Sequence, residues 1–155
     1  MDAVLRPATL ADTDVLVRLM EEYYAFDGIP WDEAGARAAL AGLLADPTAG
    51  RVWLICSGVE TVGYVALTFG YSLEYQGRDA FVDEIYLSEP YRGRGFGRQA
   101  FADVFEVCRA LDVHAVHLEV ARRNTSAQAL YRRLGFEDRN HYMMSKRIER
   151  RRQTA

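Results

Sequence analysis

The sequence has few of the residues from which metal centres and covalent cross-links are built. It contains two cysteines and three histidines among 155 residues. Cys56 and Cys108 are far apart and belong to no CxxC pair. His114 and His117 are three positions apart, which places them on opposite faces of a strand, and no third ligand accompanies them. We therefore expect reduced, inert thiols and no metal site.

Long apolar runs and a large charge of one sign are also missing. No stretch approaches the roughly 18 apolar residues of a membrane span, and the first ten residues lack the apolar core of a signal peptide. We therefore expect a cytoplasmic protein without a membrane partner. The formal net charge is −3, which disfavours a nucleic acid as the partner.

No internal repeat or Pro/Ser-rich linker divides the chain, so we expect one domain over residues 1–148. The end of the chain differs in charge. The last ten residues carry five basic side chains and one acidic side chain, a net charge of +4, which leaves −7 for the rest. A basic terminus of this kind is usually solvated, and we predict a frayed tail over residues 149–155.

Hydrophobic periodicity predicts alternating strands and helices. Patterns of period two predict strands, and apolar stripes at helical spacing predict helices. The strand–helix–strand order in the second half implies a right-handed crossover within one sheet. The last predicted helix lies within residues 124–137, with Thr125 and Gln128 in capping-box spacing and Gly135 as its stop. The expected strands cover residues 3–9, 51–57, 61–70, 80–87, 114–120 and 141–148, and the other expected helices run from Thr9 or Asp12 to about Tyr24, from Asp32 to about Leu44, and from Gly97 to about Asp112.

The stretch PYRGRGFGRQA, residues 90–100, combines glycines and arginines between a predicted strand and a predicted helix. Where a strand enters a helix, the first backbone N–H groups have no intrahelical acceptor, and the helix dipole favours an anion. The glycines would let a phosphate approach the backbone, and the arginines could add charge-assisted hydrogen bonds. These residues are Gly93, Gly95 and Gly97, with Arg92, Arg94 and Arg98. The pattern predicts a phosphate-binding turn, with a tight turn carrying solvated arginines as the alternative.

The spacing of this turn separates it from other phosphate-binding loops. It lacks GxxxxGK[ST], and the third glycine of GxGxxG would fall at Arg98. The pattern Arg92-x-x-Gly95-x-Gly97 resembles the R/Q-x-x-G-x-G/A signature of the GNAT superfamily of N-acetyltransferases. The segment LEVARRNTSAQALYRRLGFE, residues 118–137, is similar to a second recurrent segment of that family. The resemblance covers nearly the whole chain. It implies an α/β fold with a mixed central sheet of six to seven strands, a splay between the fourth and fifth strands, and about four flanking helices.

The resemblance also implies a ligand and an activity. Acetyl-CoA would enter the splay with its pyrophosphate on the loop, and its acetyl group would pass to a primary amine in a ternary complex. Tyr131 would point its hydroxyl at the sulfur, unless it is an ordinary packed aromatic. The acyl oxyanion would be held by a main-chain N–H near Tyr86 or Leu87. The implied coenzyme-binding residues are Ile85, Tyr86, Leu87, Arg92, Gly93, Arg94, Gly95, Phe96, Gly97, Arg98, Asn124 and Ala127.

The attacking amine must be neutral, and an alkyl ammonium with a pKa of about 10.4 loses its proton at pH 7 at a cost of roughly 4–5 kcal/mol. A general base is therefore useful, and Asp83 and Glu84 lie in the strand that would border the acyl group. Neighbouring strand residues face opposite ways, so we expect only one of them to face the acceptor, and we leave open which. Alternation groups Asp83 with Phe81, Ile85 and Leu87, and Glu84 with Val82 and Tyr86. Glu119 is a weaker candidate.

The loop between the first two helices combines carboxylates and aromatic rings, which favour a cation. These residues are Glu21, Glu22, Tyr23, Tyr24, Phe26, Asp27 and Trp31. We expect the loop to bind a primary amine, either polyamine-like or of the lysine type. In the alternative interpretation these residues cap a helix and fill core. The candidate acceptor residues are Glu22, Tyr24, Phe26, Asp27 and Trp31.

Other functions stay open at this point. They are a catalytically silent acyl-CoA sensor, an arginine-rich nucleic-acid module, and an acetyltransferase acting on a protein lysine or N-terminus. A small-molecule amine is the expected partner, a homodimer is left open, and the length of the acyl group is undetermined.

Overall fold

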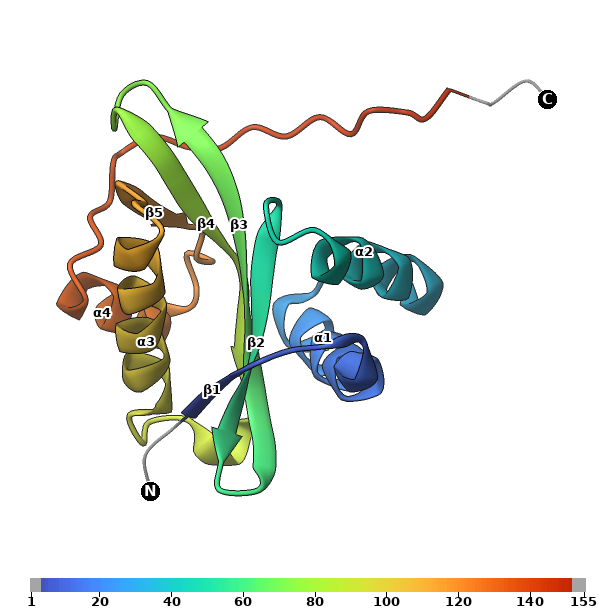
Figure 1. Cartoon of the computed structure of the whole chain (residues 1–155). Coiled ribbons are helices and arrows are strands. Elements are labelled where there is room, and N and C mark those ends of the chain that lie inside the picture. The colour runs from blue at the N-terminus through green and yellow to red at the C-terminus, as the bar shows by residue number, and fades with distance from the viewer. Residues whose placement is uncertain (1–3, 152–155) are drawn as a thin grey trace.

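A five-stranded mixed sheet runs through the computed structural model, which describes residues 4–151 (Figure 1). The strands lie in the order β1-β2-β3-β4-β5; β4 and β5 are parallel, and the other pairs are antiparallel. The strands are β1 (Val4–Pro7), β2 (Gly50–Ser57), β3 (Glu60–Ser72), β4 (Gly77–Leu87) and β5 (Ala115–Leu118). The helices are α1 (Thr13–Asp27), α2 (Glu33–Ala45), α3 (Phe96–Ala110) and α4 (Thr125–Arg133), with short 3-10 turns η1 (Leu10–Asp12) and η2 (Glu89–Tyr91).

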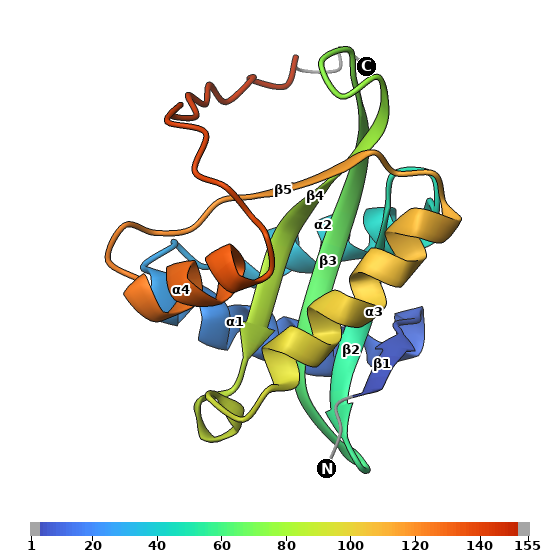
Figure 2. The same ribbon diagram turned by 90° about the vertical axis from the view of Figure 1, so that its left-hand side faces the viewer.

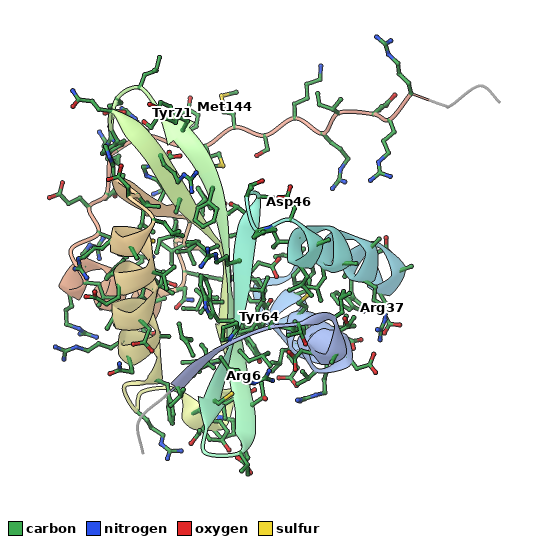
Figure 3. All side chains as sticks on the ribbon, viewed as in Figure 1. Arg6, Arg37, Asp46, Tyr64, Tyr71 and Met144 are labelled. Carbon is green, nitrogen blue, oxygen red and sulfur yellow. The ribbon has the colours of Figure 1, made fainter. Side chains whose placement is uncertain are left out.

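Helices cover both faces of the sheet, with α1 and α2 on one side and α3 and α4 on the other (Figure 1). The core consists of two hydrophobic layers, one on each face of the sheet. Alternate side chains of β2 contribute to both layers: Ile55 packs toward α3, whereas Leu54 packs toward α1 and α2. Phe101 and Val104 complete the first layer. Tyr64 is fully buried in the second layer and lies at the centre of the molecule (Figure 3).

A β-bulge interrupts β4 at the predicted catalytic strand. Leu67 of β3 pairs with Val82, and Ala66 pairs with Glu84, so Asp83 is an extra residue without a partner on β3. Because of this insertion, Val82 packs in the same layer as Ile85. The uninterrupted alternation that we expected over residues 80–87 is therefore wrong. The bulge alters the path of the chain at Asp83 and Glu84.

β4 and β5 separate after a short parallel pairing. Asp79 to Val82 pair with Ala115 to Leu118, whereas β4 continues to Leu87 without β5 beside it. The chain after β5 then swings outward to α4 (Figure 2). This divergence is the splay expected between the fourth and fifth strands.

Over residues 4–151 the sheet has five strands, fewer than the six to seven that we expected. Residues 141–148, expected as a strand, form no regular structure and extend away from the sheet (Figure 1). Arg139 is held by Glu74 and Tyr75 at the turn between β3 and β4, and the chain leaves the body beyond that point. Of the predicted frayed tail, residues 149–151 are exposed and irregular, and residues 152–155 lie outside the described range.

The start of α4 also differs from its prediction by one residue. Asn124 is the N-cap, and its side-chain Oδ1 accepts a hydrogen bond from the Ala127 backbone N–H at 3.2 Å. The predicted capping box of Thr125 and Gln128 is wrong because Thr125 is already the first helical residue. Gly135, with φ of +92°, follows the end of the helix, as expected. Within residues 4–151, no helix combines the length and apolar character that a membrane span requires.

Candidate active site

The glycine-rich turn exposes a row of free backbone donors at the start of α3. Among residues 4–151, the backbone N–H groups of residues 93–98 donate no hydrogen bond. Gly93 and Gly95 have positive φ values of +69° and +89°, and a Cβ built on either meets no atom within 4 Å. The turn therefore offers several amides and open space to an anion, as the sequence predicts.

Gly97 serves a different purpose from the other two glycines. A Cβ at this position would lie 3.4 Å from Leu130 Cδ2 and 3.8 Å from Leu87 Cδ1. Gly97 therefore lets α3 approach α4 and the end of β4. The ring of Phe96 is buried in the α3 layer, so only its backbone is available to a ligand.

The arginines of the turn separate into two groups. The Arg92 Nε donates to the Leu87 carbonyl at 2.9 Å, and its guanidinium lies 4.5 Å from the centroid of the Phe26 ring and 5.4 Å from that of Tyr86. Arg92 thus joins the turn to α1. Arg94 stacks over the rings of Tyr91 and Phe96, and Arg98 is exposed on the first turn of α3. Arg94 and Arg98 remain the cations exposed to solvent beside the free amides.

The carboxylates of Asp83 and Glu84 both lie at the bulge in β4, but only that of Glu84 accepts side-chain hydrogen bonds. The Tyr24 hydroxyl donates to Glu84 Oε2 at 2.5 Å, and the Tyr64 hydroxyl donates to Oε1 at 2.7 Å. Burial raises the pKa of Glu84, and the two phenol donors oppose that shift. Among the described residues, the Asp83 carboxylate accepts no hydrogen bond. It is exposed to solvent, yet desolvation by the surrounding protein raises its pKa. Asp83 is therefore free to accept a proton, whereas Glu84 orients two tyrosines.

The raised pKa of Asp83 predicts a change of stability with pH. The folded chain holds the Asp83 proton more tightly than the unfolded chain, whose aspartates have a pKa of about 3.9, so the ionised carboxylate destabilises the fold once the pH exceeds the folded pKa. We expect Asp83→Asn to raise the free energy of unfolding at pH 7, and the gain to shrink as the pH falls toward 4. Urea unfolding across this range measures it.

Glu21→Gln is the control for this comparison, because the Glu21 side chain is exposed on α1. Its effect on the free energy of unfolding should be small at every pH. If Asp83→Asn destabilises the fold at pH 7, the Asp83 carboxylate is stabilised by its surroundings and the predicted direction is wrong.

Tyrosines surround these carboxylates. Burial raises the pKa of Tyr23 to about 12, and the charges of Asp27, Glu84 and Asp83 add to this shift. The Tyr23 ring meets that of Tyr24 edge-on, with centroids 5.6 Å apart. Asp83 and Glu84 both raise the pKa of Tyr23 and of Tyr24, so both carboxylates lie within electrostatic reach of the same tyrosines. Which of the two carboxylates faces the acceptor stays a prediction.

Tyr23 belongs to the loop that we expected to form the acceptor wall, whereas Tyr64 was not predicted as a site residue. No local signal in the sequence points to Tyr64. Its contact with Glu84 joins residues 20 positions apart and depends on the register of β3 against β4.

Tyr131 lies on α4 and packs against the aromatic rings of the α3 layer. Its ring centroid lies 5.7 Å from that of Phe101 and 5.9 Å from that of Phe136, both edge-on. Burial raises the pKa of Tyr131, and this phenol also contributes to the shift at Tyr23. The hydroxyl therefore stays protonated and lies within electrostatic reach of the carboxylate cluster.

The predicted acceptor residues divide between two places. Trp31 meets the ring of Tyr24 edge-on at 5.3 Å, and Tyr24 is the residue whose hydroxyl binds Glu84. Asp27 forms an ion pair with Arg123 at 3.3 Å. Glu22 and Phe26 lie elsewhere, near Arg92 and the end of β4. Glu22 accepts from the hydroxyls of Tyr86 at 3.3 Å and Ser88 at 3.4 Å. Of the five candidates, Tyr24, Asp27 and Trp31 are thus the better placed.

Other predicted groups have structural partners of their own. The Asn124 side chain and the Ala127 amide bind each other, and their predicted role toward the coenzyme stays a prediction. His117 contacts Asp79 at 3.1 Å. Over the described range, no group of three or more His, Cys, Asp or Glu side chains could hold a metal ion.

Comparison with known sequences identifies the family. The model of the Acetyltransferase (GNAT) family matches residues 16–136. The chain is 35% identical over 81 residues to the thialysine N-epsilon-acetyltransferase of Bos taurus, an overlap that covers 52% of this chain and 47% of that protein. The chain spans about half, or less, of the length of the curated relatives that it matches.

Solved structures extend the likeness to the whole fold. An integron cassette protein from the mobile metagenome of Cole Harbour Salt Marsh has a TM-score of 0.83 at 36% identity, over 95% of this chain and 91% of that chain. A predicted acetyltransferase from Clostridium acetobutylicum, solved with acetyl-CoA, has a TM-score of 0.78 at 16% identity, over 93% and 96% of the two chains, and shows a likeness of fold alone. On the match to the family model and the turn that precedes α3, the chain belongs to the GNAT family of acetyltransferases.

Proposed function

We propose that the chain transfers the acetyl group of acetyl-CoA to a primary amine by direct attack in a ternary complex. One observation carries this proposal: the free amides of residues 93–98 and the unpaired Asp83 lie at the two ends of the stretch of β4 that diverges from β5. One end can hold a diphosphate and the other can hold a proton. The names of the bovine relative and the Clostridium structure support the donor and the reaction class.

The coenzyme would bind chiefly to backbone groups. The amides of residues 93–98 would hold the pyrophosphate, assisted by Arg94 and Arg98. Beyond Val82, β4 has no strand pairing on its β5 side, so the backbone of residues 85–87 is available to the amides of the pantetheine arm. This arrangement would bring the thioester between Tyr131 and the bulge.

The chemistry needs one proton acceptor and one hydrogen-bond donor. Asp83 would take a proton from the acceptor ammonium, and the neutral nitrogen would attack the thioester carbonyl carbon. The C–N bond forms, the C–S bond breaks, and the sulfur leaves as a thiolate. The nitrogen then gives up the proton that the amide does not retain, and this proton passes through solvent to the thiolate to give the free thiol. Full proton transfer from an ordinary phenol to a thiolate is uphill by about 2 kcal/mol, and the raised pKa of Tyr131 increases that difference. Tyr131 would therefore act by donating a hydrogen bond to the sulfur.

The acceptor we propose is an aliphatic primary amine of the lysine or polyamine type. Its ammonium would meet Asp83 and Asp27 among the rings of Tyr23, Tyr24 and Trp31. Glu84 would shape this wall by fixing Tyr24. The relative named for thialysine acts on an amine of this kind, which supports the same class here.

A panel of amines tests the proposal, with release of the coenzyme A thiol as the signal. We expect release to depend on the amine and to be highest with lysine, thialysine and linear diamines. Binding of acetyl-CoA without release by any amine would favour the sensor over the enzyme. Thiol release with lysine-bearing peptides but with no free amine would indicate that the acceptor is a lysine side chain of a protein.

Replacing Tyr131 by phenylalanine should lower kcat by about tenfold to a hundredfold, the value of a hydrogen bond to a developing thiolate. The Kd for acetyl-CoA should change little, because the ring and its packing remain. Tyr71→Phe, which removes a hydroxyl from an exposed side chain on β3, is the control. An unchanged kcat in Tyr131→Phe would remove this residue from the chemistry.

A further inference from the structure

An ion pair joins the end of α1 to the chain that leads from β5 to α4. Asp27 is the last residue of α1, and Arg123 lies just before α4. The Arg123 Nη2 donates to the Asp27 backbone carbonyl at 3.1 Å and to Oδ1 of the Asp27 carboxylate at 3.3 Å. The two residues are 96 positions apart and belong to segments on opposite sides of the splay, which Figure 2 shows from the side of α4.

The pair adjoins the candidate acceptor residues. Tyr23 and Asp27 are four positions apart on α1, so they lie on one face of the helix. The Asp27 charge raises the pKa of Tyr23, and the Asp83 charge does so as well. One carboxylate thus approaches this phenol from the end of α1 and the other from the bulge in β4. An acceptor whose amine meets Asp83 therefore has the Asp27–Arg123 pair within its surroundings.

Both members of the pair keep unused polar atoms. A guanidinium has five N–H donors on three nitrogens, and Arg123 uses only Nη2 for Asp27. Within residues 4–151, its Nε and Nη1 donate no hydrogen bond, and the side chain is 68% exposed. Over the same range, Oδ2 of Asp27 accepts no hydrogen bond. A free anion acceptor and a free set of cationic donors therefore lie side by side.

This pair is complementary to the head of an α-amino acid, which carries an ammonium and a carboxylate on one carbon. The ammonium can donate to a carboxylate, and the carboxylate can bind a guanidinium through two parallel hydrogen bonds. A linear diamine would instead bring a second cation toward Arg123, which costs electrostatic energy. A lysine inside a peptide has neither charge at this position. The pair therefore distinguishes among amines of the lysine type.

We propose that Asp27 and Arg123 bind the charged head of a free diamino acid, with Asp27 on its α-ammonium and Arg123 on its α-carboxylate, while its side-chain amine meets Asp83. Arg123 is then a specificity-determining residue that touches no reacting atom. The head-group site rests on the proposed function for the reaction of the side-chain amine, whereas binding of the head does not require that reaction.

Arg123 also has a structural role that the test must separate from recognition. α1 has no basic residue in its last turn, and Arg123 supplies a cation at this negative end of the helix dipole. Loss of that cation would destabilise α1 and affect every acceptor alike. A change in the ratio between two acceptors reports on recognition alone.

The test compares lysine with 1,5-diaminopentane, which is lysine without its carboxylate. We expect kcat/KM, measured by thiol release, to be at least about tenfold higher for lysine, the effect of a charge-assisted hydrogen bond. Arg123→Met should abolish this preference by lowering kcat/KM for lysine and not for the diamine. Arg122→Met is the matched control, because Arg122 is the adjacent exposed arginine and forms no ion pair within residues 4–151. It should keep the preference.

Isothermal titration calorimetry of both amines, with coenzyme A present, gives a measurement that needs no turnover. Tighter binding of lysine by at least about tenfold, without thiol release, would support the head-group site even though acetyl transfer fails. Equal affinities for the two amines, or no binding of lysine, would overturn the site. So would equal effects of Arg122→Met and Arg123→Met on the preference, or a uniform loss across all acceptors in Arg123→Met.

Discussion

Replacing Asp83 by asparagine should lower kcat by about 10²- to 10⁴-fold at neutral pH, the usual contribution of a positioned general base. The Kd for acetyl-CoA should be unchanged, because the amides that would bind the diphosphate lie on another element. Asp83 is singled out because it is unpaired and open to solvent at the bulge, whereas both oxygens of Glu84 are occupied by Tyr24 and Tyr64.

Two measurements distinguish a general base from a structural carboxylate at Asp83: how the activity depends on pH, and how it depends on the pKa of the acceptor amine. Asp83 must be ionised to act, and its raised pKa predicts that activity falls on the acid side at a higher pH than for an ordinary aspartate. Acceptors that are already neutral at pH 7 need no base, so Asp83→Asn should slow them much less than it slows lysine. A loss that is equal for acidic and basic amines would contradict the assignment.

Two neighbouring carboxylates provide the controls. Glu119→Gln removes an exposed charge just after β5 and should change kcat by less than about threefold. Glu84→Gln replaces one acceptor oxygen with a donor, so one tyrosine hydrogen bond is lost, and the main effect should be on stability and on KM for the amine. If Glu84→Gln lowers kcat more than Asp83→Asn does, Glu84 is the base.

Replacing Gly95 by alanine should weaken the binding of acetyl-CoA at least about tenfold, or about 1.4 kcal/mol. Its Cβ would enter space that holds no protein atom within 4 Å, at the centre of the free amides. The same change also strains the backbone, because φ is +89° at this position. Isothermal titration calorimetry with coenzyme A measures the affinity directly.

Gly135→Ala is the matched control, because Gly135 has a φ of +92° and also has no atom within 4 Å of a built Cβ. Both variants should lose a similar free energy of unfolding, of the order of 1 kcal/mol. Only Gly95→Ala should lose affinity for coenzyme A. Unaltered affinity in Gly95→Ala would mean that the diphosphate binds elsewhere.

The features predicted well are those set by neighbours in the chain. The turn before α3 follows from closely spaced glycines, and two of them take the positive φ values that favour glycine. The four helices and the strands β1 to β5 follow from periods of 3.6 and two, which are also local. The N-cap of α4 was predicted one residue too late, at Thr125 in place of Asn124. Both residue types are good N-caps, so local sequence does not distinguish the two positions.

The features predicted poorly depend on distant contacts. The strand expected at residues 141–148 has the right pattern, but a strand needs a partner, and the binding of Arg139 at the turn between β3 and β4 leads the chain past β5. Likewise the contacts of Glu22 with Tyr86 and of Phe26 with Arg92 depend on how α1 packs beside the end of β4, and the sequence did not predict these contacts.

By itself, the sequence determined the family, the phosphate-binding turn and the order of the elements, because each rests on residues within a few positions of one another. Only the tertiary structure distinguished Asp83 from Glu84. That distinction requires the bulge in β4, which arises from its register against β3, and the two tyrosines that reach Glu84 from 60 and 20 positions away. Such contacts form only when the sheet and α1 have come together, and no local pattern specifies them.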